Sequence, residues 1–432
     1  MKMKKIKTLL SSVIVLLFVQ CEKPSTACFS MSSATAYINQ LVTFTSCSSC
    51  KNCSNHNTAS DLQWDFGDGA KASGANVNHT YTSPGQYHVT LTSNDADGDA
   101  KGTVTQTITI IKMSDLSRSG KFITFTSNVD GDYDIYLAQV DGNGNLATTN
   151  LVFSSNPYNL TNANTLTDKQ SNWSSDGRIL VYSAQLTAGG DENIYAFFFK
   201  ADGTLVSTTP TLVQSQTAAW DENPGFSPDG KYIVFDRRVD TNSDGVVDAA
   251  DSRDIAMASV TTTTTSITVN AITKLTNTVG IDEDNAKWAP LISVQRIAYE
   301  SPPSSTANDH DVYVMDPLNP TNNIDYNNPG SSGYPAWAPD CSSITFESNS
   351  GNGGFYKIVS AGYPNNTGTT DVAKSSSQNY RYPTRLPNGT QVAYIQILAG
   401  KGNIYIVPIG GGTSAKLLPS TFDNADNSYP AW

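Results

Sequence analysis

The stretch from Asp240 to Asp251 carries a regular series of oxygen-bearing side chains. Counted from Asp240, such side chains stand at positions 1, 3, 5, 9 and 12, and a glycine stands at position 6. They belong to Asp240, Asn242, Asp244, Asp248 and Asp251, and Val246 at position 7 would add a backbone carbonyl. Hard oxygen ligands at this spacing, with a turn-making glycine, are typical of a calcium-binding loop. The stretch therefore predicts one bound Ca²⁺ ion.

This loop resembles the calcium loops of dockerins and related EF-hand-like repeats. A sensor EF-hand ends its loop with glutamate, whereas position 12 here is Asp251. The resemblance therefore implies a structural ion rather than a signalling one. The alternative is an acidic hairpin that is simply solvated.

Catalytic side chains are sparse in this sequence. It contains four histidines, at positions 56, 79, 88 and 310, and no Gly-x-Ser-x-Gly nucleophile elbow. His310 is the one histidine after residue 88, so a multi-histidine metal centre is not expected in the long C-terminal part. Paired carboxylates acting as general acid and base remain the catalytic option.

A repeated sequence motif, called the blade phrase below, predicts the strands that would position these side chains. Residues 173–178 and 226–231 each combine a bulky aromatic residue with a Ser-x-Asp-Gly turn, and an alternating apolar run follows. Degenerate copies occur near residues 116, 288, 337, 385 and 432, so the spacing is 47 to 62 residues. A four-stranded propeller blade has a period of about 40–50 residues. We therefore predict a six-bladed β-propeller over residues 114–432.

A second phrase follows each apolar run, as in Asp134-Ile135-Tyr136 and Asp311-Val312-Tyr313. The two phrases in alternation resemble the WD40-like repeats of TolB-type propellers. The resemblance implies that Ser428 to Trp432 form the inner strand of the first blade and bury Trp432. Closing the ring in this way leaves no free sheet edge.

Residues 28–112 are predicted to form a separate immunoglobulin-like sandwich. Their short apolar runs alternate with period two and are separated by Gly, Asp and Pro turns. Three ordered motifs, at 64–69, 79–81 and 84–91, resemble those of a PKD domain. We expect Trp64 in the core, Asp65 and Asp68 as turn-capping side chains, and His79 in a structural role. The fold class predicted for the whole chain is thus all-β.

Four cysteines fall in this small domain: Cys28, Cys47, Cys50 and Cys53. In an oxidising compartment an even set predicts two disulfides, whose pairing the sequence leaves open. A metal cluster is the alternative, although no fourth ligand stands at suitable spacing. Cys341 is expected to be buried or idle.

The N-terminus has the character of an export signal. Four lysines precede an apolar stretch from Leu9 to Val19, which is shorter than the roughly 20 residues of a spanning helix. Cys21 follows at once, so residues 1–20 resemble a lipoprotein signal peptide, and 21–27 a tether after a lipidated Cys21. An ordinary cleaved signal is the alternative. The resemblance implies an outer-membrane lipoprotein of the bacterial cell envelope.

The net charge of the chain limits the kinds of molecule that it is expected to bind. The formal net charge is −12, whereas nucleic-acid binding needs a basic footprint, so no nucleic acid is expected. Acidic loops are predicted to gather on one propeller face and to attract cations or a basic surface. We predict a non-enzymatic binding or scaffold protein that recognises an envelope protein or glycan. The alternatives are a polysaccharide lyase or glycoside hydrolase that uses channel carboxylates, and an accessory carbohydrate-binding protein.

Overall fold

The computed structural model describes most of residues 26–432. Outside the described residues lie 1–25 and the segments 33, 38–41, 49–61, 84, 95–100, 112–121, 142–143, 149–151, 163–165, 186–190, 201–202, 215–218, 249, 279, 305–308, 327–329 and 366–368. The chain divides into two compact units, Met1–Ile111 and Lys112–Trp432. The predicted signal peptide and Cys21 fall among the residues that are not described. The described residues contain no α-helix that could span a bilayer.

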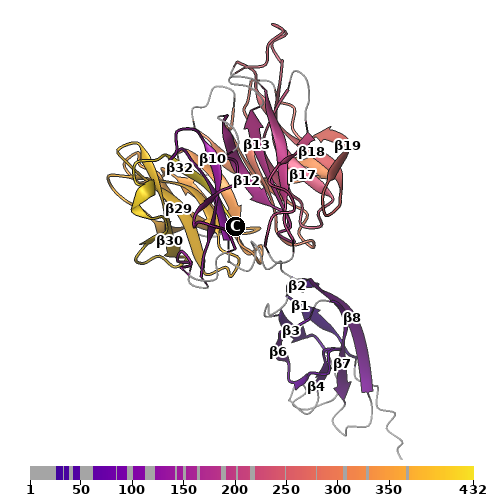
Figure 1. Cartoon of the computed structure of the whole chain (residues 1–432). Helices are drawn as coiled ribbons and strands as arrows, with labels where there is room; N and C mark the ends of the chain where they lie inside the picture. Colours follow the sequence, from indigo (N-terminus) through magenta and orange to yellow (C-terminus); the bar gives the residue numbers. More distant parts are fainter. Residues whose placement is uncertain are drawn as a thin grey trace, which may run out of the picture. The chain divides into compact units, whose positions relative to one another are not determined.

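The N-terminal unit is a sandwich of two sheets, drawn in indigo to purple in Figure 1. One sheet has the order β1 (Phe29–Met31), β3 (Val42–Ser46), β6 (Asn76–His79). The other has the order β2 (Thr35–Tyr37), β8 (Lys101–Ile111), β7 (Gly85–Asn94), β4 (Leu62–Asp65), β5 (Lys71–Ser73). The inner faces bury one apolar cluster around Phe44, Trp64 and Phe66. Trp64 is 1% exposed, as predicted.

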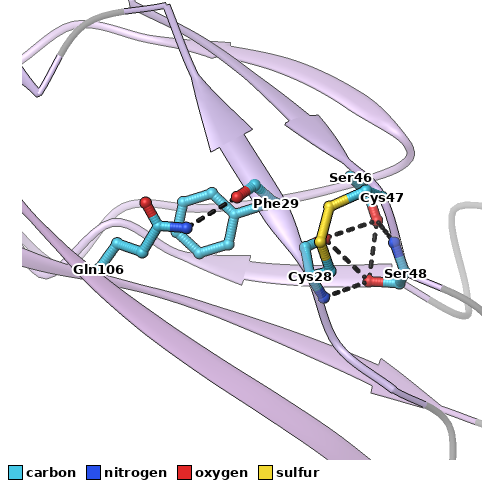
Figure 2. The surroundings of a disulfide bond; sticks show 6 residues. All are labelled: Cys28, Phe29, Ser46, Cys47, Ser48 and Gln106. Atoms are coloured by element: carbon cyan, nitrogen blue, oxygen red, sulfur yellow. Dashed lines mark hydrogen bonds between the residues drawn. A yellow bond between two sulfur atoms is a disulfide. The ribbon is translucent and has the colours of Figure 1, made fainter.

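One disulfide joins the first strand of this sandwich to its neighbour. Cys28 and Cys47 are bonded, with their Cα atoms 4.9 Å apart, beside the pairing of β1 with β3 (Figure 2). The hydroxyl of Ser48 accepts the backbone N–H of Cys28 at 3.1 Å and so reinforces the same corner. Cys50 and Cys53 lie outside the described residues, so a second disulfide stays a prediction.

Six four-stranded antiparallel sheets make up the C-terminal unit. The first three, in hydrogen-bonded order, are β32 (Asn427–Ala431), β9 (Phe122–Ser127), β10 (Asp134–Gln139), β11 (Tyr158–Asn159); β12 (Asp168–Trp173), β13 (Ile179–Gln185), β14 (Glu192–Phe198), β15 (Thr211–Gln214); and β16 (Ala219–Phe226), β17 (Tyr232–Val239), β18 (Arg253–Thr262), β19 (Ile267–Lys274). The others are β20 (Asp284–Trp288), β21 (Ile297–Ser301), β22 (Asp311–Asp316), β23 (Asn319–Asp325); β24 (Ser332–Trp337), β25 (Ser343–Ser348), β26 (Lys357–Gly362), β27 (Thr370–Ala373); and β28 (Asn379–Arg385), β29 (Gln391–Leu398), β30 (Lys401–Pro408), β31 (Ala415–Lys416). These sheets are the six predicted blades, numbered one to six in this order.

The repeated Ser-x-Asp-Gly phrase forms the turn after each of two inner strands. The hydroxyl of Ser174 donates to Asp176 at 2.6 Å and accepts the N–H of Ile179 at 3.0 Å. Gly177 has a φ of +63°, a left-handed conformation that glycine adopts without strain. Residues 226–231 repeat the same contacts, which explains why the phrase recurs with the fold.

The ring closes through the C-terminal strand. Strand β32 pairs with β9, with Ser428 opposite Thr126, and thereby completes blade one. An apolar cluster that includes Phe125 of blade one and Ile395 of blade six fills the space between these blades. Trp432 packs against that cluster but is only half-buried, so its predicted burial is incomplete. The strand ends at Ala431, which leaves its indole at the end of the sheet.

Deletion of Ser428 to Trp432 should destabilise the whole propeller rather than fray a tail. It removes the inner strand of blade one and the closure of the ring. We expect a loss of roughly 3–5 kcal/mol in the free energy of unfolding, the range for losing one large core side chain. Calorimetry of the full chain and the truncated chain measures this loss. An unchanged propeller transition would contradict closure by β32.

Candidate ligand-binding cavity of the propeller

The inner strands of all six blades surround a central cavity of about 180 Å³. Its wall includes Ser175, Pro228 and Pro290, which belong to the turns after the inner strands of blades two, three and four. The cavity therefore lies at the turn end of the propeller. The predicted acidic loops belong to the opposite end.

Each inner strand carries one non-glycine residue in the left-handed region, with φ between 48° and 57°. These six residues, called the bulge residues below, are Gln170, Asn223, Asn285, Tyr334, Tyr382 and Tyr429. The register of each inner strand with its neighbour shifts at this point, as in a β-bulge. All six bulge residues line the cavity. The bulge is therefore the device that presents a side chain to the centre.

A side chain from the preceding blade holds most of these bulges. The backbone N–H of Tyr334 donates to Glu300 at 2.6 Å, and that of Tyr382 donates to Glu347 at 2.9 Å. The N–H of Asn285 likewise donates to Asp236 at 2.9 Å. At two joints the acceptor is a hydroxyl instead. The N–H of Asn223 donates to the hydroxyl of Ser183, and the N–H of Gln170 donates to that of Thr126, both at 3.3 Å. Each acceptor is buried on the second strand of its blade.

The bulge residues divide the cavity wall into two chemically different halves. Blades two to four contribute the amides of Gln170, Asn223 and Asn285. Blades five, six and one contribute Tyr334, Tyr382 and Tyr429. The ring of Tyr382 lies 4.5 Å from that of Tyr334 and 4.7 Å from that of Tyr429, measured between centroids. One half is thus a hydrogen-bonding surface and the other an aromatic one.

Aromatic residues end most of the inner strands and also line the cavity. They are Trp173, Phe226, Trp288, Trp337 and Trp432, and Arg385 takes the corresponding place in blade six. Among the described residues, the buried indole nitrogens of Trp173, Trp288 and Trp432 have no hydrogen-bond partner, and neither does Nε of Arg385. A buried donor without an acceptor costs roughly 1–3 kcal/mol. Four residues of the wall thus carry a buried donor without a described acceptor.

The charged groups on the cavity wall are both cationic. Lys287 donates from Nζ to the side-chain oxygen of Asn223 at 2.7 Å. Burial lowers the pKa of Lys287 to about 8, and the nearby Asp236 opposes that shift. Arg385 donates to the Thr345 hydroxyl at 3.1 Å and to a backbone carbonyl. No Asp or Glu is among the described residues of the wall.

At the opposite end, part of the predicted acidic face is folded inward. Asp221 is 1% exposed and paired with Arg237 at 2.7 Å. Glu222 is 5% exposed and pairs with Arg253 at 2.9 Å. Lys169 approaches both Glu222 and the buried Glu192. These acids pair with cations of the same or the neighbouring blade, so the face is less charged than the sequence indicated.

Two channel carboxylates do converge in blade four. Oxygens of Asp284 and Glu300 lie within 4.8 Å of each other and of a ring nitrogen of His310. Burial raises the pKa of Glu300 to about 7, and burial together with the charge of Glu300 raises that of Asp284 well above its usual range. Neither carboxylate is among the described residues of the cavity wall. Glu300 accepts the backbone N–H of Tyr334, so this carboxylate holds a bulge rather than facing a ligand in the cavity.

The predicted calcium loop lies between β17 and β18. Its carboxylates accept backbone N–H groups: Asp240 from Ser243 at 2.6 Å and Gly245 at 2.9 Å, and Asp251 from Thr241 at 2.7 Å. Within the described part of the chain, the acids of this loop do not form a group of three with oxygens inside 4.8 Å. The side chains are of the kinds that bind Ca²⁺, whereas in this conformation they accept hydrogen bonds from the loop backbone. The ion stays a prediction.

Sequence reasoning missed the bulge residues because their types differ from blade to blade. A signal was nevertheless available, since each stands three residues before the residue that begins the blade phrase, as Tyr334 does before Trp337. In three blades the bulge residue is a tyrosine followed by a proline: Tyr334, Tyr382 and Tyr429.

Comparison with known proteins agrees with this architecture. Residues 37–110 match the family model described as PKD domain. The propeller resembles TolB from Acinetobacter baumannii, which is 16% identical over 81% of this chain and 80% of that one, with a TM-score of 0.54. The chain carries a PKD domain followed by a TolB-like propeller. A sequence identity this low supports a shared fold and carries no information about function.

Two further structures are similar. Hydrazine synthase from Kuenenia stuttgartiensis is 12% identical over 72% of this chain and 46% of that one, with a TM-score of 0.51. The PKD1 domain of the Vibrio cholerae metalloprotease PrtV is 30% identical over 20% of this chain and 98% of that one, with a TM-score of 0.17. No curated protein sequence matches the chain.

Gly333→Ala should disturb the joint between blades four and five. A Cβ at Gly333 would overlap Oε2 of Glu300, which cannot swing away without releasing the N–H of Tyr334. We expect a loss of roughly 1–3 kcal/mol, as for other overpacked sites. Gly410→Ala is the matched control because nothing lies near its Cβ position. Equal denaturant midpoints for the two variants would disprove the steric argument.

The propeller should lose stability as pH rises from about 4.5 to about 7. Burial raises the pKa values of Glu300 and Glu347 to about 7, above the usual value near 4.5. The folded chain therefore binds these protons more tightly than the unfolded chain, and that advantage disappears as pH passes through about 7. Glu300→Gln should flatten the pH profile of the unfolding free energy, while the surface variant Asp423→Asn should not. A steeper profile in Glu300→Gln would overturn the assignment.

Calcium binding at the loop should be abolished by combining Asp240→Ala with Asp244→Ala. Calcium modules outside the cytoplasm bind with dissociation constants of roughly 10⁻⁴–10⁻³ M, so titration calorimetry must reach millimolar calcium. Asp316→Ala, in blade four, serves as the control. If the unaltered protein takes up no heat-detectable calcium in that range, the loop is a solvated acidic hairpin.

Proposed function

We propose that this chain is a non-enzymatic binding protein of the bacterial envelope, and that its propeller receives a segment of a partner protein in the central cavity. The observation that carries the proposal is the cavity wall, where three amides, three tyrosine rings and the cations Lys287 and Arg385 line one space. Concave sites that combine aromatic surface with a few polar groups are where proteins bind ligands. A peptide segment would offer carbonyl groups to the amides and cations, and side chains to the aromatic rings.

The carbohydrate-active enzyme is less well supported than the binding protein. Acid–base cleavage of a sugar chain needs two carboxyl groups that both reach the substrate. The converging pair, Asp284 and Glu300, is not among the described residues of the cavity wall, and Glu300 is committed to the N–H of Tyr334. The cavity offers donors, amides and aromatic rings instead.

An envelope location fits the sequence and the disulfide together. The lysine-rich, apolar N-terminus is the pattern of an export signal, with Cys21 as the proposed lipid attachment site. The bond between Cys28 and Cys47 is of the kind that persists in oxidising compartments. We therefore propose that a lipid on Cys21 anchors the protein to the outer membrane. The PKD domain would then serve as a spacer.

Photo-crosslinking from the cavity tests this function. A benzophenone amino acid placed at Ser175, on the cavity wall, should give a discrete adduct with an envelope protein in living cells. The same probe at Leu318, which is 87% exposed on the turn between β22 and β23, is the control. Identical adduct patterns from both positions, or none from Ser175, would contradict binding in the cavity.

A further inference from the structure

We propose that Asp284, Glu300 and His310 of blade four form a binding site for one divalent transition-metal ion of the zinc type. This site goes beyond the proposed function, because none of the three is among the described residues of the cavity wall. Its evidence comes from the geometry of the three side chains, from a ring nitrogen without a partner, and from the charge around the two carboxyl groups.

Strand pairing places the three side chains next to one another. Asp284 on β20 lies directly opposite Glu300 on β21, and His310 immediately precedes β22, the next strand of the same sheet. Blade five holds the backbone of His310, since Ser332 donates its N–H to the His310 carbonyl at 2.6 Å. One ligand atom of each residue lies within 4.8 Å of the other two. The strands themselves therefore position the three ligands.

These separations suit an ion at the centre of the group. Zinc forms bonds of about 2.0–2.2 Å to histidine nitrogen and carboxylate oxygen, so two of its ligands lie at most about 4.4 Å apart. Nδ1 of His310 is 3.9 Å from a carboxylate oxygen of Glu300, which is within that limit. The widest separation in the group, up to 4.8 Å, exceeds the limit by an amount that small side-chain rotations remove.

The ring of His310 offers a nitrogen that the fold leaves unused. Its Nδ1 is buried and has no hydrogen-bond partner among the described residues, because 3.9 Å to Glu300 is too long for one. By contrast, His79 contacts Asp68 at 2.8 Å and His88 contacts Thr107 at 3.1 Å. The His310 side chain is 35% exposed, so an ion reaches the carboxyl groups past this ring.

No cation nearby is committed to the two carboxyl groups. Arg253 lies 3.4 Å from Asp284, but its shorter contact, at 2.9 Å, is to Glu222. Arg381, the cation of the neighbouring joint, pairs with Glu347 at 2.5 Å. The site therefore holds two carboxyl groups against a shared part of one guanidinium.

The protons on these carboxyl groups reflect the same shortage of positive charge. Burial raises the pKa of Glu300 to about 7, and burial together with the charge of Glu300 raises the pKa of Asp284 well above its usual range. A divalent ion would displace the retained proton and supply the missing charge. The N–H of Tyr334 binds Oε2 of Glu300, whereas Oε1 is the oxygen nearest His310, so the ion and the bulge use different oxygens.

The ligand types favour zinc over calcium. Imidazole nitrogen suits zinc and its neighbours in the first transition series, whereas calcium and magnesium prefer oxygen ligands throughout. Three protein ligands leave one position of a tetrahedral zinc ion for water. Because Glu300 also holds the bulge of blade five, the ion would reinforce the joint between blades four and five.

Nuclear magnetic resonance of the histidine rings tests this site in the full chain labelled with ¹⁵N-histidine. The protein is freed of metal with a chelator and titrated with zinc sulfate, and His310→Gln assigns the His310 signals. We expect one equivalent of zinc to shift Nδ1 of His310 and to leave the ring signals of His79 and His88 in place. A shift of Nε2 in place of Nδ1, or no shift of His310 with zinc in excess, would overturn the proposal.

Variants separate this site from the predicted calcium loop. Asp284→Asn and His310→Gln should each weaken zinc binding in titration calorimetry by at least about tenfold, since changes even outside the ligand shell cost about 10–100-fold. Asp240→Ala combined with Asp244→Ala should leave zinc affinity unchanged. His88→Gln is the matched control, because His88 lies on an exposed strand of the PKD domain.

Two results of this comparison would contradict the proposal. If the loop variant loses zinc binding and His310→Gln keeps it, the ion belongs to the loop. If millimolar calcium displaces zinc from the unaltered protein, the site does not select a transition metal. Should Asp284→Asn fail to fold, His310→Gln and the ring signals of the unaltered protein still decide the question. Crosslinking from Ser175 reports on the cavity alone, so failure of the metal site leaves the proposed function to its own test.

Discussion

The hydrogen bond between one blade and the bulge of the next organises the centre of this propeller. A residue in the left-handed region turns its N–H out of the strand ladder, and a buried N–H needs an acceptor. Glu300, Glu347 and Asp236 supply that acceptor across three joints, and two hydroxyls supply it across two more. Because the acceptor belongs to the preceding blade, each blade fixes the position of its neighbour's cavity residue.

The joint between blades six and one is built differently. The position that carries the acceptor elsewhere is Ile395, which cannot accept a hydrogen bond. Asn427 instead donates to the carbonyl of Gly402 at 2.6 Å, and an apolar cluster fills the space between the blades. This joint also adjoins the pairing of the first propeller strand, β9, with the last, β32. Packing and one buried amide therefore close the ring where the repeated polar joint is missing.

The parts of the structure that depend on local pattern were predictable from sequence. The spacing of Trp173, Phe226 and their copies predicted six blades, and the alternation around Trp64 predicted the sandwich. What depends on which side chains face each other across paired strands was not predictable. Asp221 and Asp284 have the same appearance in the sequence, yet one meets Arg237 across a strand pair while the other meets Glu300. The bulge residues escaped notice because a backbone conformation, rather than a residue type, is what they share.

The charged residues at the two ends of the propeller differ in whether they are paired. At the acidic end, Lys169, Arg237 and Arg253 are paired with carboxylates, and those pairs hold neighbouring strands and blades together. At the turn end, Lys287 and Arg385 are left without such partners, beside indoles that donate to nothing described. Pairing them with an internal Asp or Glu would satisfy the same donors within the fold. A wall that keeps its cations unpaired forgoes that stability, as is expected if the proposed site binds another molecule.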